Sequence, residues 1–273
     1  MLSIIIPSFN PKIKKICATL ESIFQNSGDY EVILVLQKTS TLKQNEIKNF
    51  FYNKDNFKII IDLGVGISRA RNKAIKESRG DWFLLLDDDV YIKKNVIKNL
   101  NKQISEDDYF YYGNALIKNT NINYVKYYIK NKDLSIWSYN RVCSISLIIN
   151  RKTFNHIGTF DESLGTGCLM GSSEESDLII RALLSNIRIK YIKNFNVYHD
   201  LAIHSLDKVE AYAMGSGALH KKHINSKKIQ LYIKFILDLL LRLIFLLSFR
   251  RKRYIFIRGF LKGFFKYENK KKA

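Results

Sequence analysis

Three consecutive carboxylates, Asp87, Asp88 and Asp89, follow the apolar run at residues 82–86. Such a run predicts a buried strand, and ligands of open α/β sheets bind just outside the carboxyl ends of the strands. Adjacent carboxylates repel one another, and their oxygens are the ligands that Mg²⁺ and Mn²⁺ prefer. We therefore expect a divalent cation, Mn²⁺ or Mg²⁺, held by Asp87 and Asp89. The alternative is a solvated acidic turn.

The segment around this acidic run carries a family resemblance. Residues 67–90, ISRARNKAIKESRGDWFLLLDDDV, resemble the nucleotide-sugar core of the inverting glycosyltransferases of family 2, among them bacterial surface-polysaccharide glycosyltransferases. The resemblance covers roughly residues 1–215. It implies a GT-A fold, a Rossmann-like α/β domain whose DxD element binds the metal and the diphosphate of a nucleotide sugar. On this basis Asp87 and Asp89 would bind the metal, and Asp87 and Asp88 the donor.

Two further segments correspond to the donor side of the family. PSFN includes Pro7, Ser8 and Asn10 and matches a loop that lies beside the nucleotide base. The ARN run includes Arg71, whose guanidinium suits a diphosphate because its fork makes bidentate charge-assisted hydrogen bonds. All four are expected donor contacts. An ordinary strand-to-helix turn and a solvated helix arginine are the alternatives.

The end of the second predicted strand departs from the family. Relatives usually have a pair of Asp residues there, one of which contacts uridine, whereas this chain has Leu36 and Gln37. The amide of Gln37 can pair with a pyrimidine edge, but it supplies no carboxylate. The expected donor is a UDP-linked or other pyrimidine nucleotide sugar, with the identity of the base left open.

Acidic residues later in the chain resemble the acceptor side of the family. The run GTFDE includes Asp161 and matches a GGFDE element, and EESDLIIR at 174–181 matches EDxDLxxR at a helix start. In the family the second carboxylate of the latter motif is the catalytic base, which assigns that role to Glu175. Asp161, Glu174 and Asp177 are expected on the acceptor side.

The implied reaction explains why a carboxylate is needed. An inverting transfer is a single displacement, in which an acceptor hydroxyl attacks the anomeric carbon opposite the leaving nucleoside diphosphate. A base within about 2.6–3.2 Å takes the hydroxyl proton. Acids at a helix start also stabilise the helix dipole, which is the structural alternative for Glu174 and Asp177. His199, after a late strand, could complete the metal shell or could be structural.

Composition limits the class of protein. The 273 residues, 47% of them hydrophobic, are enough for one large α/β domain with an appendage. Cys17, Cys143 and Cys168 are an odd number without metal-ligand spacing, which argues against a disulfide framework and indicates a reducing cytosol. The chain opens on an apolar run without a basic n-region, so no secretory signal is predicted.

Strands are predicted at short apolar runs, and helices where apolar residues recur every three or four positions. Residues 105–140 are polar, aromatic-rich and poorly periodic, which predicts loops. The predicted strands are 2–7, 31–36, 57–61, 82–86, 143–150 and a pair within 187–197, and the predicted helices are 12–25, 45–52, 93–104 and one that starts at 174.

The basic excess of the chain lies in its tail. The formal net charge is +20, and residues 221–273 alone carry 16 Lys and Arg against two acids. We predict a catalytic domain at 1–226 and a basic amphipathic helical tail at 227–273. Such a block of charge could meet nucleic acid or an anionic membrane surface. Its charges alternate with long aliphatic side chains rather than with stacking aromatics, so nucleic acid is not an expected partner.

Residues 229–249 are long enough to span a bilayer, but Lys234, Asp238 and Arg242 stand four apart and form one polar stripe. A charge near the bilayer centre costs ~2.5–3.5 kcal/mol, which argues against spanning. We expect a helix lying in the membrane interface with that stripe in water, then a similar helix, with anionic lipid attracted by the basic run at 250–253. In the alternative, the apolar faces pack on the catalytic domain or on a second subunit.

Together these features predict a membrane-associated glycosyltransferase on the cytoplasmic side of the inner membrane. It would move a sugar from a nucleotide donor to a glycan acceptor, lipid-linked through polyprenyl diphosphate, in surface-polysaccharide synthesis. The alternative class is a non-catalytic membrane-bound scaffold of the same fold that binds nucleotides or carbohydrates, because the second-strand carboxylate is missing.

Overall fold

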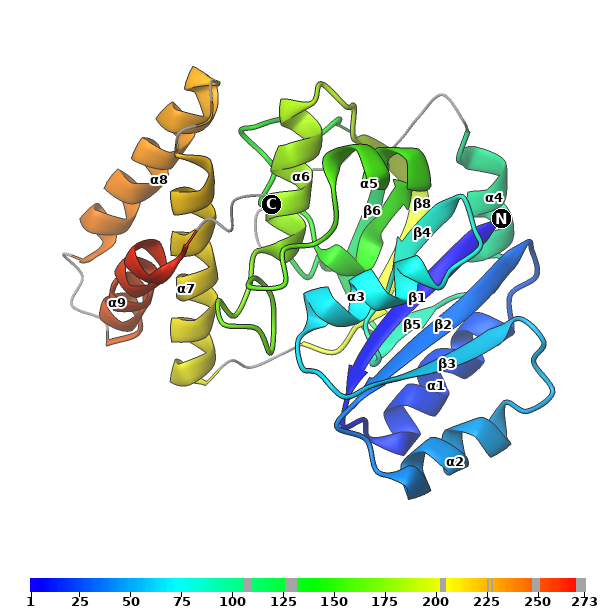
Figure 1. Cartoon of the computed structure of the whole chain (residues 1–273). Coiled ribbons are helices and arrows are strands. Elements are labelled where there is room, and N and C mark those ends of the chain that lie inside the picture. The colour runs from blue at the N-terminus through cyan, green and yellow to red at the C-terminus, as the bar shows by residue number, and fades with distance from the viewer. Residues whose placement is uncertain are drawn as a thin grey trace.

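The computed structural model describes residues 1–105, 110–125, 132–201, 205–224, 226, 228–246 and 251–268. These residues form an eight-stranded sheet with helices on both faces and a helical layer at one side (Figure 1). The strands are β1 (Leu2–Phe9), β2 (Tyr30–Gln37), β3 (Phe57–Asp62), β4 (Trp82–Leu85), β5 (Val90–Ile92), β6 (Phe110–Ile117), β7 (Leu147–Asn150) and β8 (Lys190–His199). The helices are α1 (Ile13–Phe24), α2 (Thr41–Phe50), α3 (Ile67–Lys76), α4 (Val96–Gln103), α5 (Arg151–Ile157), α6 (Glu174–Leu184), α7 (Leu206–His223), α8 (Ile229–Leu246) and α9 (Arg251–Lys266). The predicted α/β class is confirmed.

Four parallel strands, in the order β3-β2-β1-β4, bring their carboxyl ends to one edge of the sheet. Phe9, Gln37 and Asp62 end the first three strands of the chain and are register partners across the sheet. β4 ends at Leu85, so the acidic residues after it lie at the same edge. The sheet continues as β7-β6-β8-β5, in which β7 and β5 run antiparallel to their neighbours.

The central strands are buried on both faces. Ile4 belongs to a buried cluster with Leu20 of α1, whereas Ile5 belongs to a second cluster with Ala74 of α3. Successive side chains of a strand point to opposite faces, so a strand covered on both sides is a continuous apolar run. This is why the runs in β1, β2 and β4 were recognisable in the sequence.

Three segments differ from the sequence prediction. β6 lies within residues 105–140, where loops were predicted, β8 is one strand rather than a pair, and 143–150 opens with a 3-10 turn before β7. In β6 the ladder shifts register between Tyr112 and Asn114, and a Cβ at Gly113 would lie 2.5 Å from the carbonyl oxygen of Phe195. At this bulge Gly113 and Asn114 divide the apolar run of β6 into two short pieces, which hides the strand in the sequence.

The last three helices, α7, α8 and α9, form what we call the C-terminal helical layer (Figure 1). The backbones of α7 and α9 touch, because a Cβ at Gly217 would stand 2.0 Å from the carbonyl oxygen of Phe260, and one at Gly263 2.0 Å from that of Met214. The predicted domain boundary after residue 226 falls inside this layer, between α7 and α8. Among the described helices, none combines the length and the apolar character needed to cross a bilayer.

α8 turns its polar stripe toward the protein. The side chains of Lys234 and Asp238 form an ion pair and are only 12% and 14% exposed. Leu231 and Phe235 are buried on the same helix, and the ammonium of Lys234 lies 6.0 Å from the ring centroid of Tyr139. The expectation that this stripe faces water is therefore wrong for Lys234 and Asp238. The two charges neutralise each other one helical turn apart, which makes their burial tolerable.

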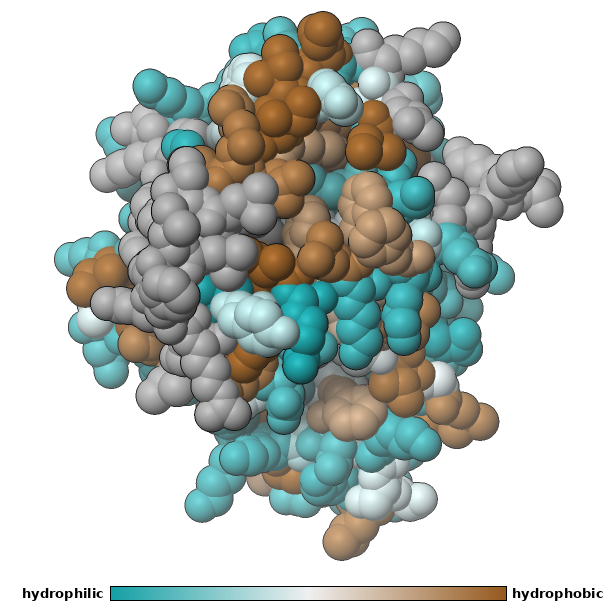
Figure 2. All heavy atoms as spheres, turned by 90° about the vertical axis from the view of Figure 1, so that its left-hand side faces the viewer, coloured by the Kyte–Doolittle hydropathy of each residue, from teal (hydrophilic) through white to brown (hydrophobic). Residues whose placement is uncertain are grey.

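The outward face of α8 is apolar. Figure 2 looks onto this side of the molecule and shows hydrophobic side chains gathered in its upper part. The side chain of Arg242 and residues 247–250, which the prediction also used, lie outside the described part of the chain. The large apolar side chains of α8 that are 39–52% exposed are Tyr232, Ile233, Ile236, Leu237, Leu239, Leu240 and Leu241.

Candidate active site

A cavity of about 810 Å³ opens at the carboxyl edge of the parallel strands. It lies where the topology of an open α/β sheet places a ligand. Among the predicted site residues that the structure describes, Asn10, Arg71, Asp161 and Asp177 are not part of its lining. Those that line it are Pro7, Ser8, Gln37, Asp87, Asp88, Asp89, Glu174, Glu175 and His199.

The three carboxylates after β4 reach this cavity with different partners. Asp87 accepts a hydrogen bond from Arg71 at 3.2 Å, Asp88 accepts one from the hydroxyl of Ser8, and Asp89 pairs with His199 Nε2 at 2.9 Å. Burial raises the pKa of Asp87. Burial and the neighbouring carboxylates also raise the pKa of Asp88, to about 6. We call these three carboxylates the acidic tip. Their negative charge is only partly compensated by cations of the protein.

The acidic tip fits a hard divalent cation by the chemistry of its donors. Asp87 and Asp89 offer carboxylate oxygens to the same cavity, and the raised pKa of Asp87 shows that further positive charge would be favourable there. The described side chains contain no ready-made cluster of three or more His, Cys, Asp or Glu ligands. The two carboxylates thus form an incomplete shell, of the kind that substrate phosphates and water complete around Mg²⁺.

His199 is engaged through both ring nitrogens. Nε2 bonds Asp89 at 2.9 Å, and Nδ1 lies 2.5 Å from the carbonyl oxygen of Asp200. Burial lowers the pKa of His199, but the hydrogen bond to Asp89, the charge of Asp89 and the carbonyl oxygen of Asp200 together outweigh it, so that the pKa is raised. The same bond holds the pKa of Asp89 below its usual range, with Lys15 at 3.5 Å adding to the effect. In this arrangement His199 orients Asp89.

Arg71 lies behind the cavity wall rather than on it. Its guanidinium is fully buried and joins Asp87 at 3.2 Å to Glu174 at 2.9 Å. Its Nε has no hydrogen-bond partner among the described residues. Because α3 carries Arg71 and α6 carries Glu174, this one side chain connects the acidic tip to the start of α6. The predicted donor contact would have to act through Asp87.

Glu175 lines the cavity from the first turn of α6. That helix begins after Ser173, whose φ of 75° lets the chain turn sharply from the preceding loop into the helix. Burial, and then the charge of the adjacent Glu174, raise the pKa of Glu175. A carboxylate with a raised pKa in a cavity is suited to take up a proton, as a general base must.

Gln37 lines the cavity, but its amide is used within the protein. Nε2 donates to Asp62 at 2.8 Å and to the carbonyl oxygen of Gly66 at 3.2 Å, and Oε1 accepts from the backbone N–H of Gly66 at 3.1 Å. Gly66 has a φ of 121°, and a Cβ there would lie 2.6 Å from Cys168 Sγ. Pairing of Gln37 with a base would require this exchange of hydrogen bonds to open. Asn10, just after the neighbouring strand β1, accepts from Lys43 at 2.7 Å.

Comparison with known proteins decides the family. The family model described as Glycosyl transferase family 2 matches residues 3–177, which is more than half of the chain. The chain belongs to glycosyl transferase family 2. The family predicted from the sequence motifs is thereby confirmed, and with it the class of enzyme.

Curated relatives carry names of the same class. An uncharacterized glycosyltransferase of Haemophilus influenzae is 28% identical over 192 residues, which are 67% of this chain and 62% of that protein. The PGL/p-HBAD biosynthesis glycosyltransferase of Mycobacterium bovis is 29% identical over 169 residues, 59% of this chain and 63% of that protein. The glycosyltransferase GlyG of Streptococcus pneumoniae is 26% identical over 110 residues, 40% of this chain and 36% of that protein. The chain thus spans less than two thirds of each relative.

Solved structures of glycosyltransferases share the fold. S. aureus TarS 1-349 in complex with UDP-GlcNAc superposes with a TM-score of 0.63 at 19% identity, over 85% of this chain and 69% of that one. The mannosyltransferase PcManGT from Pyrobaculum calidifontis, in complex with GDP-Man and Mn²⁺, gives 0.67 at 11% identity, over 98% and 88%. At these identities the likeness shows the fold alone, and it confirms the predicted Rossmann-like glycosyltransferase architecture.

The cavity extends beyond the part of the chain that the family 2 model covers. Lys208 and Tyr212 of α7 line it. Tyr124, which lies within the matched residues, lines it as well. None of these three residues was predicted from the sequence. α7 buries Ala213 and Gly217 among other small residues, so it has no apolar stripe that would mark one face as buried.

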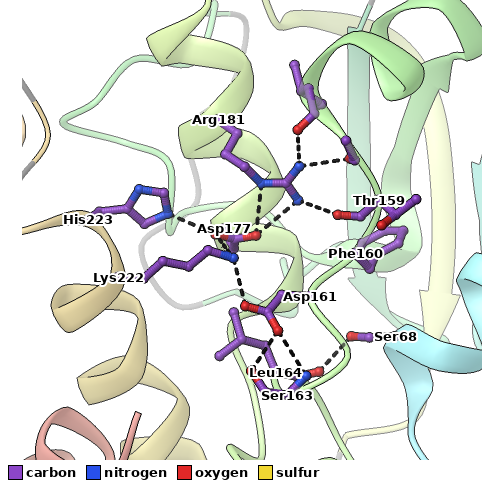
Figure 3. Close-up of polar contacts among 12 residues, drawn as sticks. Ser68, Thr159, Phe160, Asp161, Ser163, Leu164, Asp177, Arg181, Lys222 and His223 are labelled. Atoms are coloured by element: carbon purple, nitrogen blue, oxygen red, sulfur yellow. Dashed lines mark hydrogen bonds and ion pairs between the residues drawn. The ribbon is translucent and has the colours of Figure 1, made fainter. Parts of the chain in front are cut away.

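The remaining family 2 acids, Asp161 and Asp177, lie in a polar network beside the cavity (Figure 3). Asp161 accepts from Lys222 at 2.8 Å, and Asp177 is fully buried among Lys222, His223 and Arg181. Both carboxylates are therefore already paired inside the protein. Their expected acceptor-side role would have to be exerted through the elements that they hold.

Proposed function

We propose that this protein transfers one sugar, with inversion, from a nucleotide-sugar donor to a glycan acceptor. The observation that carries the proposal is that one cavity is lined both by the acidic tip after β4 and by Glu175 of α6. The two charged features come from segments about 90 residues apart in sequence, and a displacement reaction needs both in one space. The donor would be a UDP-linked or other pyrimidine nucleotide sugar, with Pro7 and Ser8 beside its base.

Each wall of the cavity has a part in the displacement. Glu175 takes the proton of the acceptor hydroxyl as that oxygen attacks the anomeric carbon. Asp88 and the Asp87–Arg71 pair face the donor side, and Asp87 and Asp89 would hold the Mn²⁺ or Mg²⁺ ion. When bound, such an ion neutralises the charge of the leaving diphosphate. Neighbours of the same fold support a nucleotide-sugar donor, because their structures contain UDP-GlcNAc or GDP-Man.

The test is turnover of a panel of nucleotide sugars by the purified full-length chain with Mn²⁺, with the anomeric configuration of the product read by NMR. Asp89→Asn should weaken metal-dependent binding of the nucleoside diphosphate, whereas Asp55→Asn, at an exposed residue just before the amino end of β3 and outside the cavity, should not. Release of sugar from none of the donors, despite binding of nucleotides, would favour the non-catalytic scaffold instead. A product of retained configuration would refute the single displacement.

We further propose that the protein works on the cytoplasmic side of the inner membrane, where α8 lies on the anionic bilayer surface. The support is the row of exposed apolar side chains on its outward face (Figure 2). Residues 221–273 carry 16 Lys and Arg against two acids, which complements anionic lipid. A polyprenyl-diphosphate-linked glycan in bacterial surface-polysaccharide synthesis is then the acceptor that such an attachment would serve.

Co-sedimentation with vesicles of phosphatidylglycerol and phosphatidylethanolamine tests the attachment. Ile236→Gln combined with Leu240→Gln should reduce binding strongly, because both side chains lie on the exposed apolar face. The matched control is Leu42→Gln, a 78% exposed leucine on α2. Equal binding by both variants would exclude this face of α8, and a concentration-dependent dimer lost in the double variant would identify a second copy of the chain as its occupant.

A further inference from the structure

A loop between α5 and α6 forms one wall of the cavity. We call residues 161–173 the acceptor loop, because they lead directly into Glu175. Thr166 and Ser172 line the cavity. The loop is closed on itself, with Met170 N–H donating to the carbonyl oxygen of Ser163 at 2.8 Å and Gly165 N–H to that of Met170 at 3.0 Å. At its middle it is held by α3, where the hydroxyl of Ser68 donates to the carbonyl oxygen of Leu164 at 2.6 Å and Ile67 N–H to that of Thr166 at 3.0 Å. The rest of its position depends on what holds its ends.

Asp161 holds the first end of the acceptor loop (Figure 3). Its Oδ1 accepts from the backbone N–H and hydroxyl of Ser163 at 3.0 and 2.6 Å. Its Oδ2 accepts from Lys222 Nζ at 2.8 Å and from the hydroxyl of Tyr267 at 2.7 Å. Burial alone would raise the pKa of Asp161, but the hydrogen bonds from Lys222, Ser163 and Tyr267 lower it to about 2. The two external donors come from the end of α7 and from just after α9.

Lys222 also holds the second end. Its ammonium lies 2.9 Å from Asp177, which is two residues beyond Glu175 on α6. Asp177 is fully buried and also accepts from His223 at 2.8 Å and Arg181 at 3.0 Å. One lysine of α7 thus joins the root of the acceptor loop to the first turn of the helix that carries the proposed base.

The flank of the acceptor loop rests on the same layer. The hydroxyl of Ser172 donates to the carbonyl oxygen of Tyr212 at 2.8 Å, and a Cβ at Gly215 would lie 2.4 Å from the carbonyl oxygen of Ser172. Leu164 and Met170 of the loop share a small buried cluster with Ala218 and Tyr267. Contacts between backbones leave little room for adjustment, so a shift of α7 or of the segment after α9 would be transmitted to the loop.

We propose that Lys222 and Tyr267 are positioning residues that set the acceptor loop and the start of α6 for sugar transfer, which makes the C-terminal helical layer a working part of the active site. The proposal rests on the proposed function for its kinetic consequence, but its structural content does not. The acidic residues follow β4 and are held by Ser8 and His199, which lie outside this network, and by Arg71, which also joins them to Glu174 at the start of α6. Removing the contacts of Lys222 and Tyr267 leaves these three partners in place, so it should affect the acceptor step and spare the donor.

The experiment uses Tyr267→Phe in the full-length chain, which removes one hydroxyl and keeps the buried ring. Losing a hydrogen bond to a carboxylate should lower kcat/KM for the acceptor about tenfold. Affinity for the nucleoside diphosphate should stay unchanged. Hydrogen–deuterium exchange should become faster in residues 161–173. Tyr254→Phe is the matched control, because this tyrosine of α9 is 64% exposed and lies outside the network.

A second pair of variants keeps the test independent of Tyr267. Lys222→Met should lower acceptor kcat/KM further than Tyr267→Phe, again with unchanged nucleotide affinity, and should make hydrogen–deuterium exchange of the acceptor loop faster still. Lys222→Arg should restore part of the acceptor kcat/KM and of the slow exchange, because it keeps a cation between Asp161 and Asp177. Equal losses in nucleotide affinity and in acceptor kcat/KM, or loop exchange at the wild-type rate in both Tyr267→Phe and Lys222→Met, would overturn the proposal. If the wild type transfers no sugar, the proposed function fails. The exchange data still decide whether Lys222 and Tyr267 hold the acceptor loop in place.

Discussion

Replacement of Glu175 by Gln should stabilise the protein at neutral pH while it removes transfer. Burial and the charge of Glu174 raise the pKa of Glu175 from its ordinary value of 4.5 to about 8. Below pH 4.5 the carboxyl group is protonated in both the folded and the unfolded chain. Above it the unfolded chain releases the proton and the folded chain keeps it, so stability falls as the pH rises toward the folded pKa.

The size of the effect follows from this linkage. Each pH unit between the two pKa values changes the free energy of unfolding by about 1.4 kcal/mol for one proton. Between pH 5 and pH 7 the wild type should therefore lose about 2–3 kcal/mol relative to Glu175→Gln, which has no proton to release. For a chain of this size that corresponds to a difference in Tm of about 4–8 °C.

The assay is thermal unfolding of both proteins from pH 5 to pH 7 in EDTA, so that no bound metal changes the charge at the cavity. Glu46→Gln is the matched control, because it makes the same chemical change at an exposed glutamate on α2, outside the cavity. A Tm difference between wild type and Glu175→Gln that stays constant over this range would refute the raised pKa.

The rate of sugar transfer also reports the protonation of Glu175. Since the ionised carboxylate is the proposed base, kcat of the wild type should rise with pH as Glu175 loses its proton. Glu175→Gln should lower kcat about 10²- to 10⁴-fold and keep affinity for the nucleoside diphosphate. Near-normal turnover of this variant would remove Glu175 as the base.

Three other predictions use the same contacts. Arg71→Met leaves the buried Glu174 and the partly exposed Asp87 without their cation and should cost about 3–5 kcal/mol in urea unfolding, whereas Arg79→Met, at a 73% exposed side chain, should cost less than about 1 kcal/mol. Gly263→Ala places a methyl group 2.0 Å from the carbonyl oxygen of Met214 and should lower stability by about 1–3 kcal/mol; an unchanged Tm would refute the close contact of α7 and α9. Because the pKa of Asp161 is lowered to about 2, its contribution to stability is present above pH 4 and is lost as the pH falls toward 2, so acid unfolding should be less steep in Asp161→Asn.

The donor half of the site was predictable because its signals are local. β1, β2 and β4 are buried on both faces and so appear as apolar runs, and parallel strands bring their carboxyl ends to one edge. Those two facts, together with the family resemblance, predicted Ser8, Gln37 and Asp87 on the donor side, and all three line the cavity. β6 is also buried along most of its length, but it was missed because Gly113 and Asn114, at the register shift, divide its apolar run.

The ion pairs of the site were not predictable from the sequence, because their partners lie far apart along the chain. Arg71 was expected to contact a diphosphate, but it binds Glu174, which is 103 residues later in the chain. Asp161 and Asp177 were expected to face an acceptor, but Lys222 of α7 holds both. A carboxylate in a motif can bind a ligand or a buried cation, and only the fold decides which cation is within reach.

The orientation of α8 shows why a charge pattern alone is an uncertain guide to solvent exposure. The spacing of Lys234 and Asp238 defines one face, and unpaired charges would keep that face in water. At a separation of four residues, however, the two side chains pair with each other, so the stripe is neutral and tolerates the interior. The apolar residues must then face outward, where water is an unfavourable neighbour. Such a face is suited to a nonpolar partner surface, and the proposed attachment to a bilayer would supply one.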